Sequence, residues 1–387
     1  MFPLIPSKIT QNLSDIIVKI QDETRSLEGG INPFVLESIE NLMLLINSYY
    51  TNSMEGNPSK LSDIENAEKN VFSSNKEMRN YQLEHIAHIE VQKLMMSRLK
   101  DEPDLDITSV EFLCWLHLEF YKRLPEEMHY VKTTSGKEFP ACPGKLRDRQ
   151  AEVGRHIPPE EEPDILRLLE QFSKKLSPKN IGDYHMKFLA FASSHHRLLW
   201  IHPFRDGNGR VARLFSIAYS NCIGISKHNL WTVTRAFART RDKYDFYLAL
   251  ADEKRRNDLD GRGPLSEENL IKFCEYFLSQ CLDQIQYMNE LLNCKNLEKR
   301  FFHELNIVRE EKTLSKGAIE VLHFLFFKGE IERGEVQKIC KIKPRRATEI
   351  IKELLDKGRI LTLFPRRGRL RLRFTTDSVK IVFPELL

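Results

Sequence analysis

The chain has 387 residues, which is too long for one simple hydrophobic core and predicts roughly two or three domains. No apolar run approaches the roughly 20 residues that a membrane span needs, and the N-terminus lacks the basic-then-apolar pattern of a signal peptide. The seven cysteines are scattered, odd in number and without a Cys-x-x-Cys pair, so we expect reduced thiols in a cytoplasmic protein.

Charge is unevenly distributed along the chain, although the formal net charge is only +4. Residues 312–387 hold 18 Lys and Arg against 9 Asp and Glu, a net charge of +9. Subtraction from the totals of 59 and 55 leaves 41 and 46 for residues 1–311, a net charge of −5. A weakly acidic body therefore carries a basic C-terminal domain.

Helical spacing dominates the first part of the chain, which we treat as an N-terminal helical region over residues 1–104. Asn32 is a good capping residue for a helix that starts at Pro33, and the apolar residues that follow recur at helical spacing until about Thr51. Two further helices are predicted at about residues 75–99 and 109–121.

Residues 105–297 are predicted to form a second, mainly α-helical domain. Glycine and proline interrupt the helical pattern between residues 132 and 159, which predicts a loop and a β-hairpin. Helices return at Pro163 and continue to about Leu297, apart from a polar, Gly-rich break at residues 258–264.

Residues 298–313 read as a charged helical linker, and residues 314–387 follow a different pattern. Three short helices are predicted, followed by two alternating strands at residues 360–364 and 370–374 around a Pro-Arg-Arg-Gly turn. Helix, helix, helix, hairpin is the order of a winged helix-turn-helix domain. The predicted fold class is thus mainly α with small β-hairpins.

The segment HPFRDGNGRVAR, residues 202–213, carries the groups that suit an anion site. It lies between two helices that are apolar on one face, and its glycines allow a sharp turn that exposes backbone N–H groups. A helix N-terminus attracts anions, and two arginines in the first turn add guanidinium groups that pair with phosphate oxygens. The predicted phosphate-binding residues are Gly207, Asn208, Gly209, Arg210 and Arg213.

Three other residues of this segment suit supporting roles in catalysis. Asp206 supplies one hard oxygen ligand, and a single carboxylate plus substrate phosphates is the usual way in which proteins hold Mg²⁺. His202 would remove a proton from an attacking hydroxyl near neutral pH, and Phe204 is most simply a core anchor. Each residue alone has an ordinary structural explanation, but their order within one short segment favours a site.

The same segment matches, without a gap, the motif His-x-Phe-x-[Asp/Glu]-Gly-Asn-Gly-Arg-x-x-Arg, and the chain thereby resembles the Fic family. The resemblance implies a Fic-type helical core and a Mg²⁺-dependent transfer of AMP from ATP to Ser, Thr or Tyr hydroxyls of proteins. The roles that it implies are a base at His202, a buried anchor at Phe204, a Mg²⁺ ligand at Asp206, and phosphate contacts at Gly207, Asn208, Gly209, Arg210 and Arg213, with Arg213 on the γ-phosphate.

Two more segments resemble parts of that family. Residues 143–159 resemble its flap hairpin, whose edge would hold a target loop by main-chain hydrogen bonds. The expected target-binding residues are Val153, Gly154, Arg155 and His156. Tyr247 would line the nucleobase pocket, with Tyr244 a less favoured candidate, although two tyrosines in an apolar helical stretch also suit a plain core.

The first long helix ends in TNSMEGN, residues 51–57, which resembles the inhibitory [Ser/Thr]-x-x-x-Glu-[Gly/Asn] motif of some Fic proteins. Thr51, Glu55 and Gly56 are the matching positions. A Glu55 carboxylate paired with Arg213 would take the partner of the γ-phosphate and occupy its space. ATP would then bind with its α-phosphate misplaced, and a misplacement of about 1 Å costs roughly a hundredfold in rate.

The basic residues of the C-terminal domain suit two kinds of partner. The third helix begins Lys343-Pro344-Arg345-Arg346, and the predicted wing carries Arg366, Arg367, Arg369, Arg371 and Arg373. A basic recognition helix and wing fit a DNA groove and backbone. The same arrangement also serves protein contacts or dimerisation, with a solvated basic face.

Three functional classes follow. We favour a protein adenylyltransferase that modifies itself and a protein target with an exposed hydroxyl loop, and that Glu55 autoinhibits; other donors than ATP, and removal of AMP at the same site, are alternatives. The second class is a metal hydrolase that uses His195, His196, His202 and Asp206, but the chain lacks a His-Glu-x-x-His motif, and adjacent helical histidines point to different faces. The third is a DNA-binding regulator whose Fic-like body only binds nucleotide.

Overall fold

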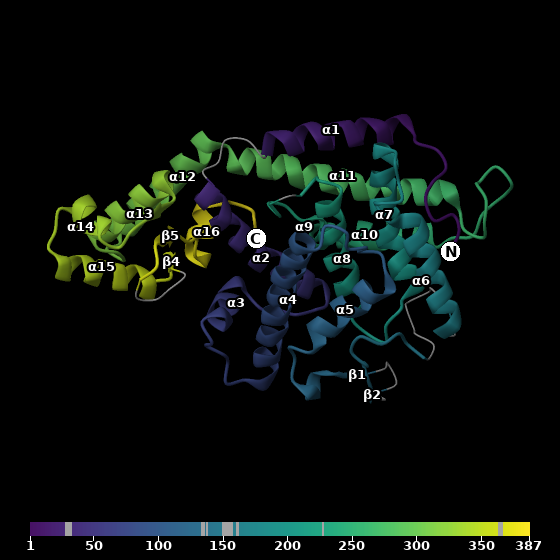
Figure 1. Cartoon of the computed structure of the whole chain (residues 1–387), viewed down its shortest axis with the longest axis horizontal. Coiled ribbons are helices and arrows are strands. Elements are labelled where there is room, and N and C mark those ends of the chain that lie inside the picture. Colours follow the sequence, from purple (N-terminus) through teal and green to yellow (C-terminus); the bar gives the residue numbers. More distant parts are fainter. Residues whose placement is uncertain are drawn as a thin grey trace. The chain divides into compact units, whose positions relative to one another are not determined.

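The computed structural model describes residues 1–27, 33–132, 136, 138–148, 158–159, 162–226, 228–362 and 367–387. It divides into two compact units, whose elements are labelled in Figure 1. Unit 1 comprises Met1–Thr24 and Asn47–Gln286, and unit 2 comprises Arg25–Ile46 and Tyr287–Leu387. The predicted boundary at residue 104 lies inside unit 1. The unit boundaries fall within continuous helices, so three helices contribute residues to both units.

Helices make up most of both units, which confirms the predicted fold class. The shared helices are α1 (Gln11–Leu27), α2 (Pro33–Met54) and α11 (Glu267–Leu292). Unit 1 also contains α3 (Leu61–Glu68), α4 (Lys76–Asp101), α5 (Val110–Tyr121), α6 (Glu162–Leu176), α7 (Tyr184–Ile201), α8 (Asn208–Cys222), α9 (Val233–Arg239) and α10 (Arg241–Ala251). A short 3-10 helix, Glu126–Met128, precedes the first strand.

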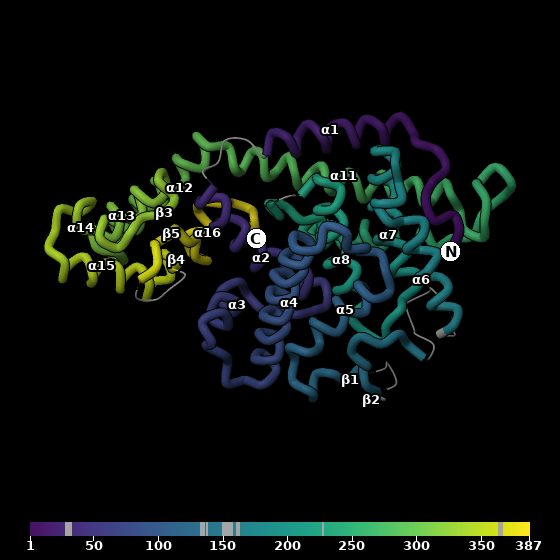
Figure 2. Tube along the Cα trace, in the orientation of Figure 1, coloured from purple at the N-terminus to yellow at the C-terminus, as the bar shows by residue number. Residues whose placement is uncertain are grey.

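Capping explains where two of the predicted helices begin. Asn75 accepts a hydrogen bond from the Met78 N–H at the start of α4, and Ser109 accepts one from the Phe112 N–H at the start of α5. Each side chain satisfies an N–H group that has no partner inside the helix. Helix α1 lies alongside α11 (Figure 2), where Glu23 accepts a hydrogen bond from Gln286.

The core of unit 1 forms around α7 and α8, which pack against each other. Helix α7 is buried along most of its length, as expected of a central helix. Phe191 of α7 stacks on Tyr219 of α8 with ring centroids 5.4 Å apart, and both side chains are fully buried. The loop between these helices, residues 202–207, is therefore held at both ends by the best-packed part of the unit.

A small hairpin is the β-structure of unit 1 in the described ranges. Strands β1 (Tyr130–Lys132) and β2 (Glu138–Pro140) pair antiparallel, with Val131 opposite Phe139. The predicted flap residues Val153, Gly154, Arg155 and His156 lie outside the described residues.

Unit 2 contains the C-terminal module, which we define as residues 314–387. Its elements are α13 (Lys316–Lys328), β3 (Glu330–Ile331), α14 (Glu335–Cys340), α15 (Pro344–Asp356), β4 (Ile360–Thr362), β5 (Leu370–Leu372) and α16 (Thr376–Val382). The strands form one antiparallel sheet in the order β3-β5-β4. Three helices and a hairpin thus come in the predicted order, and the winged-helix assignment stays a prediction that rests on this order.

The predicted linker forms most of a regular helix, α12 (Cys294–Glu310). Glu304 of α12 is buried and pairs with Arg359 at 2.8 Å, and Phe301 stacks on Phe326 of α13. Breaking a buried ion pair leaves an uncompensated charge, so this pair fastens α12 to the rest of unit 2. The predicted linker is therefore an integral helix of that unit. None of the described helices has the length and apolar character that crossing a membrane requires.

Candidate active site

His202 ends α7 in a left-handed backbone conformation, with φ 50° and ψ 59°. Residues other than glycine seldom adopt this conformation and need support from their surroundings. Arg147, which is fully buried, gives that support: its Nε donates to the His202 carbonyl at 2.6 Å, and its backbone N–H donates to the Pro203 carbonyl at 2.9 Å. The chain path at the predicted base is thereby fixed.

The next residues form a closed turn around a buried aromatic ring. Asn208 Oδ1 accepts from the Phe204 N–H at 2.9 Å, and Asn208 Nδ2 donates to the Phe204 carbonyl at 2.8 Å. Phe204 is fully buried and stacks on His117 of α5, with ring centroids 4.1 Å apart. Phe204 therefore is the core anchor that the sequence predicts, while Asn208 acts through its side chain to fix the turn.

Asp206 is oriented by two side chains of α5. Tyr121 donates its hydroxyl hydrogen to Asp206 Oδ2 at 2.6 Å, and His117 Nε2 lies 3.1 Å from the Asp206 carbonyl. The Gly144 N–H donates to His117 Nδ1, so the neutral ring carries its hydrogen on Nε2 and donates it. Burial lowers the pKa of His117 to about 4 and, together with the Asp206 carboxylate, raises the pKa of Tyr121, which keeps the phenol a donor.

This carboxylate fits a Mg²⁺ ion that substrate phosphates help to hold. Among the described residues, Asp206 Oδ1 accepts no hydrogen bond, so one hard oxygen stays available beside the helix N-terminus. Mg²⁺ usually takes one or two carboxylates and completes its shell with water and phosphate oxygens. The part of the chain that the structure describes contains no group of three or more His, Cys, Asp or Glu side chains that would hold a metal.

The alternative metal ligands His195 and His196 are core residues. His195 Nδ1 lies 2.8 Å from the Ser216 hydroxyl and Nε2 lies 2.9 Å from the Tyr244 hydroxyl. His196 Nε2 lies 3.1 Å from the Leu248 carbonyl. Both imidazoles are buried, and their nitrogens are used in packing hydrogen bonds, which disfavours a metal hydrolase.

Gly207 is the N-cap of α8, so Asn208 and Gly209 belong to the first helical turn and not to the preceding loop. Gly207 has a φ of 74°, and a Cβ added there would lie 3.2 Å from the Tyr121 ring. The N–H groups of such a first turn have no carbonyl partners inside the helix, and the helix dipole adds positive potential. This end of α8 therefore has the N–H groups and the positive potential that the predicted anion site requires.

The Glu55 carboxylate lies at this N-terminal end of α8. A Cβ added to Gly209 would lie 2.8 Å from Glu55 Oε1, so the carboxylate packs directly on the first turn of α8. Glu55 Oε1 also accepts a hydrogen bond from Arg213 in an ion pair, and Arg213 is only 4% exposed. Burial would raise the pKa of the Glu55 carboxyl, but the guanidinium groups of Arg213 and Arg210 hold it below its ordinary value.

The predicted inhibitory residues come together at the C-terminal end of α2. Arg213 Nε donates to the Thr51 hydroxyl at 2.6 Å, and a second nitrogen donates to the Thr51 carbonyl at 3.3 Å. Glu55 follows the last helical residue, and Gly56 turns the chain with a φ of 87°. Thr51 and Glu55 thus surround one guanidinium, while Gly56 acts through the backbone.

A second carboxylate, which the sequence did not single out, pairs with Arg210, the other predicted phosphate-binding arginine. Arg210 donates to Glu84 of α4 at 3.1 Å, and its guanidinium lies 5.0 Å from the centre of the Phe120 ring. Glu84 Oε2 accepts a hydrogen bond from Asn57 at 3.1 Å. Burial disfavours charge on Arg210, but Glu84 and Glu55 more than offset this and raise its pKa. Arg210 and Arg213 are therefore each paired with one carboxylate.

A buried polar network seats the last turns of α2 on α4. The Ser48 hydroxyl lies 3.0 Å from His85 Nδ1, and Asn52 Nδ2 lies 3.1 Å from the same nitrogen. The Asn52 side chain also donates to the Ser48 carbonyl. The backbone carbonyl of Asn52 accepts from the Glu55 and Asn57 N–H groups. Because all three side chains are buried, this network fixes the turn that presents Glu55.

The two candidate tyrosines differ in their surroundings. Tyr244 is 4% exposed, hydrogen-bonds His195 and stacks on Phe237, so it is a core residue. Tyr247 is half-buried and stacks on Tyr276 with ring centroids 4.7 Å apart. It lines a pocket of about 680 Å³ that none of the residues 202–213 lines, so its role at a nucleobase stays a prediction.

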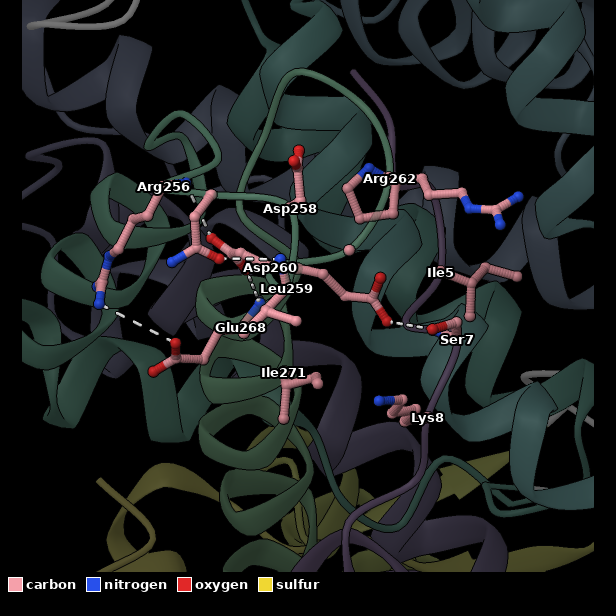
Figure 3. Close-up of a pocket in the computed structure, with 14 residues that line it drawn as sticks. Ile5, Ser7, Lys8, Arg256, Asp258, Leu259, Asp260, Arg262, Glu268 and Ile271 are labelled. Atoms are coloured by element: carbon pink, nitrogen blue, oxygen red, sulfur yellow. Dashed lines mark hydrogen bonds and ion pairs between the residues drawn. The ribbon is translucent and has the colours of Figure 1, made fainter.

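A larger pocket of about 870 Å³ also lies away from the loop (Figure 3). It is lined by the N-terminal segment, by residues 256–262, which overlap the Gly-rich break, and by the start of α11. Its buried carboxylates are already engaged: Glu267 accepts from Ser7, and Asp260 accepts from the Glu268 N–H. These contacts explain how the break is held and do not suggest a reaction.

Four of the basic residues predicted to contact a partner have acidic neighbours within unit 2. Arg345 and Arg346 both pair with Glu349, at 3.5 and 2.8 Å. Arg369 and Arg371 both pair with Glu330. Arg366 lies outside the described residues. Exposed pairs of this kind are weak, so contact with DNA and contact with protein both stay predictions.

Four residues with clear roles here were not predicted, and they come from outside the motif. They are Glu84, His117, Tyr121 and Arg147. The one signal in the sequence is that His117 and Tyr121 are i, i+4 neighbours on an otherwise apolar helix, which places them on one face. Glu84 and Arg147 carry no local signal, because their partners are distant in the sequence.

Comparison with known proteins identifies the family of this region. Residues 106–220 match the Fic/DOC family. The chain contains a Fic domain. It is 34% identical over 113 residues to a protein adenylyltransferase Fic of Nematostella vectensis, an alignment that covers 29% of this chain and 24% of the relative. It is 38% identical over 97 residues to the protein of that name from Drosophila erecta, covering 25% of this chain and 17% of the relative.

Solved structures share the fold over a longer stretch. A Fic family protein from Desulfovibrio desulfuricans G20 superimposes with a TM-score of 0.57 at 15% identity, over 96% of this chain and 98% of that chain. Fic-1 of C. elegans (residues 134–508) gives a TM-score of 0.54 at 16% identity, over 73% of each chain. The Fic domain thus lies in a larger helical fold, whereas the aligned sequence spans a quarter or less of the two curated relatives.

Proposed function

We propose that this chain is a protein adenylyltransferase that transfers AMP from ATP to a Ser, Thr or Tyr hydroxyl of a protein, and that Glu55 holds it inactive. The observation that carries the proposal is the Glu55 carboxylate on the first turn of α8, paired with Arg213. A carboxylate there marks a position that binds an anion, and a phosphate group is the stronger ligand for a helix N-terminus with two arginines.

In the proposed reaction, residues of the Fic motif accept the proton, bind the phosphates and hold the metal ion. His202 accepts the proton of the target hydroxyl, whose oxygen attacks the α-phosphorus of ATP. The new P–O bond forms as the bond to the β-phosphate oxygen breaks, and pyrophosphate leaves. The N–H groups of Asn208 and Gly209 and the guanidinium of Arg210 bind the phosphates. Asp206, oriented by Tyr121, would hold a Mg²⁺ ion, which neutralises phosphate charge when bound.

Inhibition in this proposal is a competition for one guanidinium. Arg213 uses its Nε for Thr51 and a terminal nitrogen for Glu55, so a γ-phosphate would compete with both for the guanidinium. Removal of the carboxylate would free both the guanidinium and the space beside Gly209. The partners of the protein would then be ATP and a target with an exposed hydroxyl loop, the chain itself being one such target.

The test is the intact mass of purified protein after incubation with Mg²⁺ and each nucleoside triphosphate in turn. We expect Glu55→Gly to gain the mass of AMP with ATP, the wild type to gain little, and Glu55→Gly/His202→Ala to gain none. Peptide mapping would identify the acceptor hydroxyl. Equal labelling of all three proteins, or mass gain from another donor only, would refute the proposal.

A further inference from the structure

Helix α2 belongs to both compact units of the chain. Its residues up to Ile46 lie in unit 2, and its residues from Asn47 onward lie in unit 1. The helix is continuous from Pro33 to Met54, and Glu55 follows it directly. The residue that we propose as the inhibitor is therefore attached to a helix whose other end is part of the C-terminal unit.

The first half of α2 is fastened to strand β5 of the C-terminal module. The Ser38 hydroxyl donates to the Leu372 carbonyl at 2.5 Å, and Ser38 is 5% exposed. Arg371 forms an ion pair with Glu37 at 2.6 Å, and its guanidinium lies 5.1 Å from the centre of the Phe34 ring. One strand of the module thus holds three residues of the first turns of α2, by polar and cation–π contacts.

The second half of α2 is fastened in unit 1 by contacts that include the proposed inhibitory pair. Ser48 and Asn52 bond to His85, and Thr51 bonds to Arg213. At the helix end, Arg241 donates to the Met54 carbonyl at 2.8 Å. A rotation or shift of α2 would strain these contacts together, because they lie within two helical turns.

A helix is stiff enough to transmit such a shift. With a rise of about 1.5 Å per residue, the distance along α2 from Glu37 to Thr51 is about 21 Å. No Pro or Gly interrupts the helix after its first residue, which removes the two residue types that most often kink a helix. Displacement at the β5 contact would therefore reach the turn that presents Glu55.

We propose that the C-terminal module regulates the active site through α2, so that the contact between β5 and α2 sets how firmly Glu55 occupies Arg213. This inference rests on the proposed function of Glu55 as an inhibitor. The C-terminal module would thus regulate the pairing of Glu55 with Arg213. A change at β5 that releases Glu37 and Ser38 weakens the inhibitory pair, and a change that tightens this contact strengthens it.

The test uses the full chain with Arg371→Gln, Glu37→Gln and, as the matched control, Arg369→Gln. Arg369 lies two residues before Arg371 and, like Arg371, pairs with Glu330 of β3. Its other ion pair is with Glu332, and neither partner belongs to α2. We expect Arg371→Gln and Glu37→Gln to raise auto-adenylylation about fivefold or more, and Arg369→Gln to leave it unchanged. In the Glu55→Gly background, all three substitutions should have no effect.

Amide hydrogen exchange of residues 52–57 provides a readout that needs no transfer of AMP. We expect faster exchange there in Arg371→Gln and Glu37→Gln than in Arg369→Gln, with melting temperatures close to that of the wild type. If Glu55→Gly is active but neither exchange nor labelling distinguishes Arg371→Gln from Arg369→Gln, the coupling is refuted and the proposed function stands. If exchange responds as expected but Glu55→Gly transfers nothing, the proposed function fails and the mechanical link remains.

Discussion

At the scale of single residues, the site is an arrangement of two arginines and two carboxylates around one helix N-terminus. Arg213 pairs with Glu55, and Arg210 pairs with Glu84. Each pair combines a charge from α8 with one that is distant in the sequence. Arg213 is buried and Arg210 is partly buried, so both charges need partners of opposite sign.

Glu55→Gln should activate the protein less than Glu55→Gly does. The amide keeps the size of the side chain, but it loses the ionic part of the bond to Arg213, and charge-assisted hydrogen bonds are roughly twice as strong as neutral ones. The initial rate of auto-adenylylation at saturating ATP measures this. A rate for Glu55→Gln equal to that of the wild type would mean that the side chain inhibits by its bulk alone.

Glu84→Gln should tighten the binding of ATP·Mg²⁺. The substitution removes a negative charge beside the proposed phosphate site and frees Arg210. A partly buried ion pair of this kind is worth about 1 kcal/mol, or roughly fivefold in Kd. Calorimetry in the Glu55→Gly background would measure the change. Glu77→Gln, on the exposed face of α4, is the control. Weaker binding in Glu84→Gln would instead make Glu84 the residue that orients Arg210 toward phosphate.

The sequence predicts the residues of this site well where they are consecutive and poorly where they are not. His202, Phe204, Asp206 and the predicted phosphate-binding residues are predictable as a group because their spacing is a linear pattern, and the structure places them in one loop and the helix that follows it. Glu84 and Arg147 carry no such pattern, because only the packing of α4 and of the segment around Arg147 brings them to the loop. Asn208 was assigned to phosphate, and its side chain also has a structural role in the turn.

At the scale of elements, α5 orients the loop at residues 202–207, and the N-terminus of α8 supplies positive potential beside it. His117 and Tyr121, one turn apart on α5, contact the carbonyl and the carboxylate of Asp206. Gly207 turns the chain tightly against the Tyr121 ring. The proposed Mg²⁺ ligand is thus oriented by a neighbouring helix and not by its own loop.

Tyr121→Phe should therefore raise the Mg²⁺ concentration needed for half-maximal labelling by roughly tenfold, as losses of such supporting hydrogen bonds commonly do. The assay is Mg²⁺ titration of auto-adenylylation in the Glu55→Gly background. Tyr81→Phe, which removes an exposed hydroxyl bonded to Glu77, should leave the titration unchanged. If both variants behave alike, the Tyr121 hydroxyl does not support the metal ligand.

Helix positions were predicted well because capping residues and apolar periodicity are local properties. The helices predicted to begin at residues 75 and 109 are α4 and α5, and Asn75 and Ser109 are their N-caps. The predicted linker was harder to judge, because Glu304 looks like a surface residue until its partner Arg359, far along the chain, comes into contact. The hairpin β1–β2 lies at the start of the segment expected to contain loops and strands.

At the scale of the whole molecule, the chain is two compact units that share helices, and this arrangement was not visible in the sequence. The charge difference between residues 1–311 and 312–387 points to a separate C-terminal module, whereas the boundary between the compact units lies earlier, at residues 286 and 287. It gave no sign that residues 25–46 belong with that module, because the contacts of Glu37 and Ser38 with β5 are long-range.

Unit 1 should lose stability as the pH falls from about 6.5 toward about 4. Burial lowers the pKa of His85 and His195 to about 3 and that of His117 to about 4, from an ordinary value of 6.5. In this range the unfolded chain binds more protons than the folded one, so each imidazole costs on the order of 1 kcal/mol of unfolding free energy per pH unit. Urea unfolding across this pH range measures the slope. A flat or rising stability on acidification would contradict the neutral, buried state of these rings.

The central claim is that the N-terminus of α8 binds a triphosphate and that Glu55 occupies its place. Calorimetric titration of ATP·Mg²⁺ into folded Glu55→Gly protein, beside the wild type and Glu55→Gly/Arg213→Ala, tests it most directly. We predict clear binding to Glu55→Gly, with weaker binding to the wild type and to the double variant. Absence of binding to a folded Glu55→Gly sample, or equal affinity in all three proteins, would contradict the account.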